Sequence, residues 1–165
     1  MHPLVIQLQF ARSEFLRGLE GVSGEEGVRR MLPMNSISWM VGHLANQEHR
    51  YWVRLAQGRD IAPGLHGRVG TGQPPSTPPL DEMLDTWRTI TAAADEYLET
   101  LTQETLTTFF ERDGRPVGES VGTLLHRNTY HYWFHTGEAA AVRQILGHTD
   151  LPEFVGDMTE AAYRP

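Results

Sequence analysis

The eight histidines are the residues of this chain with the clearest chemical potential, because an imidazole can bind a metal ion or transfer a proton. Only His131 and His135 stand four residues apart, which puts two rings one turn apart on the same side of a helix. Such a pair can bind one divalent metal ion, although the spacing alone is weakly specific. Tyr132 follows His131, so the glutamate of a His-Glu-x-x-His zinc peptidase is missing.

The helix that must carry this pair is predicted over about residues 120–147. On an ideal helical wheel His131, His135 and Asn128 fall within its apolar stripe, whereas His126 falls on the opposite side. A buried imidazole needs partners for both of its ring nitrogens. Two interpretations stay open: the rings share a metal ion, or each is a core histidine bonded to a neighbouring helix.

A three-ligand site would need one more side chain, and His43 is the candidate. It lies at the rim of the apolar stripe of the second predicted helix, next to Gln47, and is interpreted either as a third ligand or as a rim histidine facing water. Glu138 follows His135 by one turn. It is interpreted as an exposed carboxylate, with a hydrogen bond to a histidine ring as the alternative.

Apolar residues recur at helical spacing in four stretches, which predicts four amphipathic helices. Asn35 or Ser36 can cap the second, Thr77-Pro78 the third and Ser120 the fourth, and Gly147 is typical of a helix end. Helices of this length predict an all-α fold, an up-and-down four-helix bundle, in a single domain over residues 1–165. The predicted helices span residues 3–20, 36–56, 80–101 and 120–147.

Residues 57–79 differ from the rest of the chain because they are rich in glycine and proline. This composition predicts a long loop without regular structure, which in a compact domain is usually functional or disordered. His66 lies in this loop and is interpreted as solvated rather than as a ligand.

The remaining connections give weaker signals. Residues 21–34 are predicted as a polar connection. Residues 104–119 contain the turn signal Asp113-Gly114, so either a β-hairpin or an irregular loop fits. The tail, residues 148–165, is predicted to be an arm packed on the surface.

The composition excludes several classes of function. The chain has no cysteine, so it supplies no disulfide, thiolate ligand or thiolate nucleophile. Its 14 basic residues, all arginine, face 21 acidic ones, and a net charge of −7 argues against non-specific nucleic-acid or anionic-lipid binding. We therefore expect a cytoplasmic protein with a small-molecule substrate, and neither nucleic acid nor membrane as a partner.

Two segments resemble motifs of the DinB-like superfamily. Residues 35–44 resemble its second-helix motif, in which a His-Leu pair follows a tryptophan. Residues 120–138 resemble its last-helix motif, which has two histidines four apart followed by x-Gly-Gln. The resemblance extends over nearly the whole chain, including the long connection between the second and third helices.

The resemblance implies a four-helix bundle with an up-down-down-up course and a long crossover loop, and it implies a homodimer, because many members are dimers. Members commonly bind Zn²⁺ or Ni²⁺ through three histidines, which by motif position are His43, His131 and His135. In this chain Glu138 replaces the glutamine of the motif. Its negative charge could alter metal affinity, or the carboxylate could act as a base.

Three protein ligands leave positions open for a substrate, as in catalytic metal sites. Characterised relatives imply a transferase or isomerase that uses a low-molecular-weight thiol such as bacillithiol or mycothiol. Gln47, Asn128, Tyr132 and Arg127 are candidates to orient a substrate, with a packing role as the alternative. A metal-dependent hydrolase of a small substrate and a non-catalytic, stress-associated metal-binding dimer are the other two functions considered, and no catalytic side chain is assigned.

Overall fold

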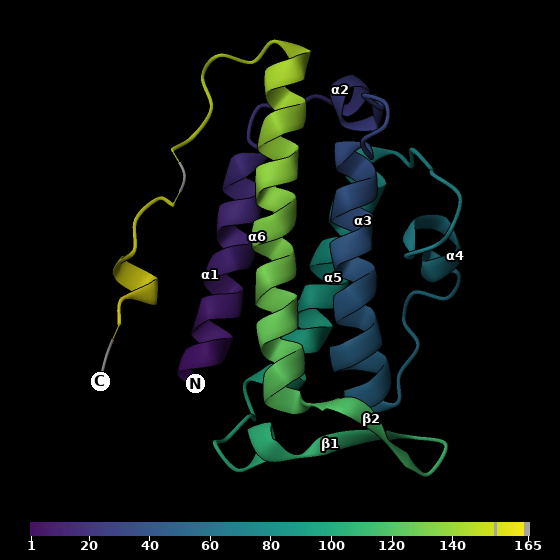
Figure 1. The fold of residues 1–165 in the computed structure, drawn as a ribbon, viewed down its shortest axis with the longest axis vertical. Coiled ribbons are helices and arrows are strands. Elements are labelled where there is room, and N and C mark those ends of the chain that lie inside the picture. Colours follow the sequence, from purple (N-terminus) through teal and green to yellow (C-terminus); the bar gives the residue numbers. More distant parts are fainter. Residues whose placement is uncertain (154, 164–165) are drawn as a thin grey trace.

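The protein is described here by a computed structural model that covers residues 1–153 and 155–163. The chain is mostly helical, which confirms the predicted all-α class (Figure 1). A π-helical segment, η1 (His49–Leu55), continues α3 without a break, so the second predicted helix is present as a whole. The four long helices are α1 (Pro3–Gly18), α3 (Ile37–Glu48), α5 (Leu80–Leu98) and α6 (Val121–Leu146).

The ends of α3 and α6 follow the capping signals of the sequence. The Ser36 hydroxyl accepts a hydrogen bond from the Trp39 backbone N–H, and the Ser120 hydroxyl accepts one from Thr123. Each serine thereby satisfies a backbone donor that the first helical turn leaves free. After α6, Gly147 adopts a left-handed conformation with φ 95°, which costs glycine little.

The start of α5 differs from the prediction. The predicted cap Thr77 is wrong, because α5 begins at Leu80, directly after Pro79, and its N-terminus has no capping hydrogen bond from a side chain. Two carboxylates in its first turn, Asp81 and Glu82, provide negative charge where the helix dipole is positive.

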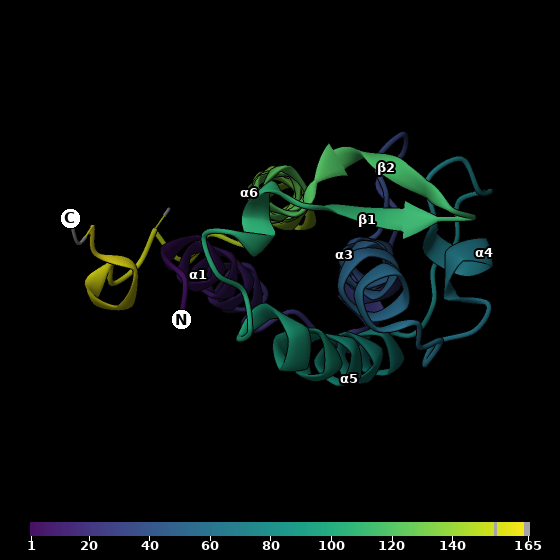
Figure 2. The same ribbon diagram turned by 90° about the horizontal axis from the view of Figure 1, so that it is seen from below.

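The long helices pack as two close pairs. α1 lies along α6, α3 lies along α5, and α3 also contacts α6 (Figures 1 and 2). Their apolar stripes meet in one core, in which the largest fully buried side chains include Phe15, Leu44, Trp52, Met83 and Tyr132. The contact between α3 and α6 brings together the two helices that carry the candidate ligands.

Two short helices lie in segments where the sequence predicts none. Within 21–34, α2 (Gly24–Val28) begins with a reciprocal capping box between Ser23 and Glu26. Within 57–79, α4 (Leu65–Val69) follows Gly64, whose φ is 83°, so the prediction that this segment lacks regular structure is wrong for these five residues. Burial of Leu65 and Val69 against α3 stabilises α4 despite the many surrounding glycines.

The segment between α5 and α6 forms the hairpin that was one of two alternatives for it. Strands β1 (Phe109–Arg112) and β2 (Arg115–Ser120) pair antiparallel after a short 3₁₀ turn, η2 (Thr105–Thr107). Asp113 and Gly114 have φ values of 53° and 70°, which two-residue hairpin turns require. The hairpin crosses the lower end of the helices in Figure 1.

The C-terminal segment returns along α1. It contains a 3₁₀ turn, η3 (Thr159–Ala161), and Gln7 donates a hydrogen bond of 3.0 Å to the Ala161 carbonyl. Of the predicted arm, residues 154 and 164–165 lie outside the described residues. Within the described parts of the chain, no helix combines the length and apolar character that crossing a membrane requires.

Candidate metal centre

Three imidazoles from two helices meet between α3 and α6. His43 lies in the middle of α3, and His131 and His135 lie one turn apart on α6. One ring nitrogen from each lies within 4.8 Å of the other two. The Nε2 atoms of His131 and His135 are 3.0 Å apart. Helical spacing thus supplies the pair, and the packing of α3 on α6 supplies the third ring.

Each imidazole is held through its Nδ1 atom by an oxygen outside the cluster. The Val69 carbonyl lies 2.7 Å from Nδ1 of His43, and a Glu138 carboxylate oxygen lies 2.7 Å from Nδ1 of His135. The side-chain oxygen of Gln47 lies 3.0 Å from Nδ1 of His131. These oxygens accept hydrogen bonds, so the neutral form of each ring carries its proton on Nδ1 and its lone pair on Nε2.

This donor set fits a divalent metal ion. With Nδ1 protonated, the facing Nε2 atoms of His131 and His135 are both acceptors and cannot hydrogen-bond to each other. A cation that accepts all three lone pairs removes this conflict. Imidazole nitrogens suit Zn²⁺ and Ni²⁺, and oxygens that hold the opposite ring nitrogen are the usual outer partners of metal-binding histidines.

The surroundings also keep the rings in the protonation state that binds metal. Burial lowers the pKa of His43 to about 4. Burial, together with the neighbouring rings of His135 and His43, lowers the pKa of His131 to about 3. Both rings are therefore neutral at pH 7, and no proton has to leave before a metal ion binds.

Trp39 packs directly on the cluster. Its ring stacks on His43, with centroids 4.3 Å apart and an interplanar angle of 13°. Among the described residues its buried indole N–H has no hydrogen-bond partner. The stack fixes the plane of the His43 ring, and Trp39 also lines an adjoining cleft.

An open cleft of about 420 Å³ adjoins the cluster, large enough for a small molecule. Side chains of α3 and α6 line one wall and residues 70–75 line the other, among them Asn35, Trp39, Gln73, Pro75, Phe134 and Glu138. The Gly/Pro-rich segment, residues 57–79, thus contacts His43 through the Val69 carbonyl and also lines the cleft next to the three rings.

The structure brings most of the predicted site residues together. His43 is buried rather than facing water, because Val69 and α4 cover the rim of α3. Glu138 bonds to His135 rather than being simply an exposed carboxylate. Gln47 and Asn128 are joined by a hydrogen bond of 3.0 Å, and Gln47 also contacts His131.

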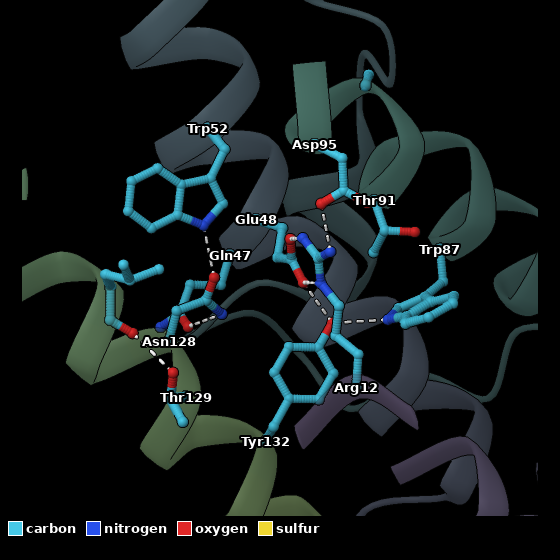
Figure 3. A network of polar contacts seen from close by, with 12 residues as sticks. Arg12, Gln47, Glu48, Trp52, Trp87, Thr91, Asp95, Asn128, Thr129 and Tyr132 are labelled. Atoms are coloured by element: carbon cyan, nitrogen blue, oxygen red, sulfur yellow. Dashed lines mark hydrogen bonds and ion pairs between the residues drawn. The ribbon is translucent and has the colours of Figure 1, made fainter. Parts of the chain in front are cut away.

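Other predicted residues lie elsewhere. Tyr132 points into the core, where its hydroxyl donates to Glu48 at 2.6 Å and accepts from the Trp87 indole at 2.7 Å (Figure 3). Its predicted role in orienting a substrate therefore has no support from its position. His66 and His126 are exposed, and Arg127 pairs with Glu119 on the surface.

The ion pairs that join α1 to α3 and α5 were not predicted from the sequence. Arg12 of α1 binds both carboxylate oxygens of Glu48 and also Asp95 of α5, at 2.6 Å from the latter (Figure 3). Burial alone would lower the pKa of Arg12, but the pairing with Glu48 raises it overall. Arg12 and Glu48 are 36 positions apart, and the only available signal was a charged residue on the apolar face of each helix.

A family model described as the DinB superfamily matches residues 7–139. This range contains all three clustered histidines and most of the four long helices. No curated protein matches the chain.

Proposed function

Because the chain belongs to the DinB superfamily, we propose that His43, His131 and His135 bind a divalent metal ion, zinc or nickel, and that the chain is a metal-dependent enzyme of the thiol S-transferase or isomerase type. One observation carries the proposal. Three imidazoles bring one ring nitrogen each within 4.8 Å of the other two, beside a cleft that admits a small molecule.

A low-molecular-weight thiol, such as bacillithiol or mycothiol, is the proposed co-substrate. When bound, the metal ion would stabilise the thiolate form of a coordinated thiol and make it nucleophilic at neutral pH. The chain contains no cysteine, so a reacting thiol has to come from a bound molecule. Trp39 and Phe134 supply apolar surface at the cleft, and Gln73 supplies an amide that can orient a polar group.

The chain's own residues prepare the site before any substrate arrives. The Val69 carbonyl, Gln47 and Glu138 fix the three rings, so that little motion is needed on binding. The 70–75 segment limits access of water from one side. Glu138 adds negative charge next to His135, which strengthens that imidazole as a donor to a cation.

Hydrolysis of a small substrate is the second candidate function, and one observation favours it. Glu138 lines the cleft, within reach of a molecule bound there, and a carboxylate can serve as a general base. Its bond to His135 competes with this role, because one of its oxygens is already engaged. A metal-binding dimer without catalytic activity is the outcome if neither chemistry is detected.

We also propose that the helices follow the up-down-down-up course of the superfamily. The support is the path of the chain in Figure 1, where α1 and α6 run upward and α3 and α5 run downward. A connection as long as residues 57–79 is needed for this course, because it must return the chain to the end of the molecule at which α3 begins.

Metal content is the first test. We expect about one zinc or nickel ion per purified chain under metal-replete conditions, and at least a tenfold loss of affinity in His135→Ala. The matched control is His126→Ala, which removes an exposed histidine from the same helix and should retain the metal. Equally low metal content in the parent chain and in His135→Ala would rule out both enzymatic functions.

The second test separates thiol chemistry from hydrolysis. Bacillithiol or mycothiol is titrated into the cobalt-substituted protein, and the absorption spectrum is followed. A sulfur-to-cobalt charge-transfer band is expected if a thiol binds the metal ion. Its absence, together with turnover of model esters or amides that Glu138→Gln abolishes, would favour the hydrolase instead.

A further inference from the structure

The three acceptors that hold the imidazoles differ in one respect. The Val69 carbonyl can only accept a hydrogen bond, and a carboxylate such as that of Glu138 accepts through either oxygen. Gln47 holds His131 through an amide, and an amide presents an oxygen at one face and an NH₂ group at the other. If the Gln47 amide were reversed, the proton of His131 would have to move to Nε2, and the lone pair offered to a metal ion would be lost.

Two further side chains determine which way the Gln47 amide faces. The Trp52 indole donates to the Asn128 side-chain oxygen at 2.6 Å, so the Asn128 NH₂ group is turned toward Gln47 (Figure 3). Asn128 then donates to the Gln47 oxygen at 3.0 Å. The same oxygen accepts from Nδ1 of His131, also at 3.0 Å.

The direction of this series is fixed at its far end. An indole N–H is a donor and never an acceptor, so Trp52 cannot reverse its bond. Trp52 and Asn128 are fully buried, and no water reaches them to replace either bond. The π-helical segment η1 carries Trp52, whereas Asn128 and His131 lie three residues apart on α6.

We propose that Trp52, Asn128 and Gln47 form a positioning chain that sets the tautomer of His131 and thereby the metal affinity of the site. None of the three touches the metal position, so each acts through the next. The inference rests on the proposed metal site, but it also makes a claim about the metal-free protein, in which His131 carries its proton on Nδ1.

The direct test is Trp52→Phe, which retains most of the ring volume and removes the donor. Long-range ¹H–¹⁵N spectra of the metal-free protein at pH 8 report the tautomer of each histidine. We expect His131 to change from Nδ1-protonated to a mixture of tautomers, and zinc affinity, measured by competition with a chromophoric chelator, to fall about tenfold or more. Trp87→Phe is the control, because it removes a buried indole that bonds to Tyr132 instead.

Gln47→Glu provides a rescue that packing alone would not predict. A carboxylate accepts through either oxygen, so its orientation no longer matters. In Trp52→Phe/Gln47→Glu the Nδ1-protonated tautomer and the zinc affinity should both return toward those of the parent chain. A double variant as impaired as Trp52→Phe would show that position 52 acts through packing and would overturn the proposal.

Asn128→Asp is the second variant, in case Trp52→Phe does not fold. The new carboxylate still accepts from Trp52 but cannot donate to Gln47, so the amide should reverse and His131 should take up the Nε2-protonated form. Unchanged His131 nitrogen shifts in the folded variants would overturn the proposal. If the parent chain binds no zinc, the proposed function fails, and the nitrogen shifts alone then decide this inference.

Discussion

At the scale of single residues, the burial of His43 and His131 has a measurable consequence for stability. Burial lowers the pKa of His43 to about 4 and that of His131 to about 3, whereas an unfolded chain has histidine pKa values near 6.5. Below pH 6.5 the unfolded state therefore binds more protons than the folded state. The free energy of unfolding is highest above about pH 6.5, and it decreases as the pH falls from 6.5 toward the pKa values of the folded state.

We therefore predict that the metal-free protein loses roughly 2 kcal/mol of unfolding free energy per buried ring between pH 6.5 and 4.5. Urea denaturation at a series of pH values measures this loss. In His43→Gln the dependence on pH over this interval should be shallower, because one of the contributing rings is absent. The same slope in the variant and the parent chain would contradict the assigned burial effect.

The candidate ligands were predictable from the sequence to different degrees. Helical spacing and the wheel place His131 and His135 inside the bundle; His135 is buried there and His131 is half-buried. The wheel of α3 put His43 at a rim, because a wheel contains no information about what covers the helix. The cover is Val69, 26 positions further along the chain, and only the family resemblance indicated His43 independently.

At the scale of elements, Gly42 allows α4 to lie close against α3. A Cβ atom at position 42 would lie 2.5 Å from the Met83 sulfur and 3.1 Å from a Val69 methyl group. These distances are shorter than ordinary contacts, so a side chain there has to displace the side chain of Met83, that of Val69, or both. Displacement of Val69 also moves the carbonyl that holds His43.

We predict that Gly42→Ala destabilises the protein by about 1–3 kcal/mol and weakens metal binding as well. The control is Gly137→Ala on α6, where a new Cβ atom meets nothing within 4 Å. That exposed helical position should gain up to about 1 kcal/mol from the better helix propensity of alanine. Chemical denaturation and zinc titration of both variants measure these effects. Unchanged zinc affinity in Gly42→Ala would show that the packing of α4 on α3 does not influence the metal site.

The long helices were predictable because each has many apolar positions in phase and a clear signal at one end or both. The short helices α2 and α4 were not, since five residues give no periodicity and glycine lowers their intrinsic propensity. Their stability comes from contacts with distant residues, such as Leu80 against Gly27 of α2. The hairpin was half predicted, because Asp-Gly indicates its turn but the strands are short and largely exposed.

At the scale of the whole molecule, one buried polar cluster connects all four long helices. Arg12 comes from α1, Glu48 from α3, Trp87 and Asp95 from α5, and Tyr132 from α6 (Figure 3). Burial raises the pKa of the Tyr132 hydroxyl, so it stays protonated and donates to Glu48. These contacts link the two helix pairs to each other through the core.

We predict that Arg12→Met lowers the unfolding free energy by about 3–5 kcal/mol, because Glu48 would remain buried without its cation. Thermal and urea denaturation measure the loss. Arg88→Met is the control: it removes an exposed ion pair with Asp85 and should change stability by less than about 1 kcal/mol. Equal effects of the two substitutions would show that the cluster contributes no more than a surface pair.

The segment between η1 and α5 performs two tasks with one short stretch of chain. Val69 orients an imidazole, and the six residues that follow shape the space in front of it. A mutation or an insertion here would change the geometry of the proposed metal site and the shape of the cleft together. Variants selected for a new substrate should therefore often show altered metal retention, whereas substitutions of Gln47, which holds His131 from outside this cleft, would change metal affinity with less effect on which molecules enter.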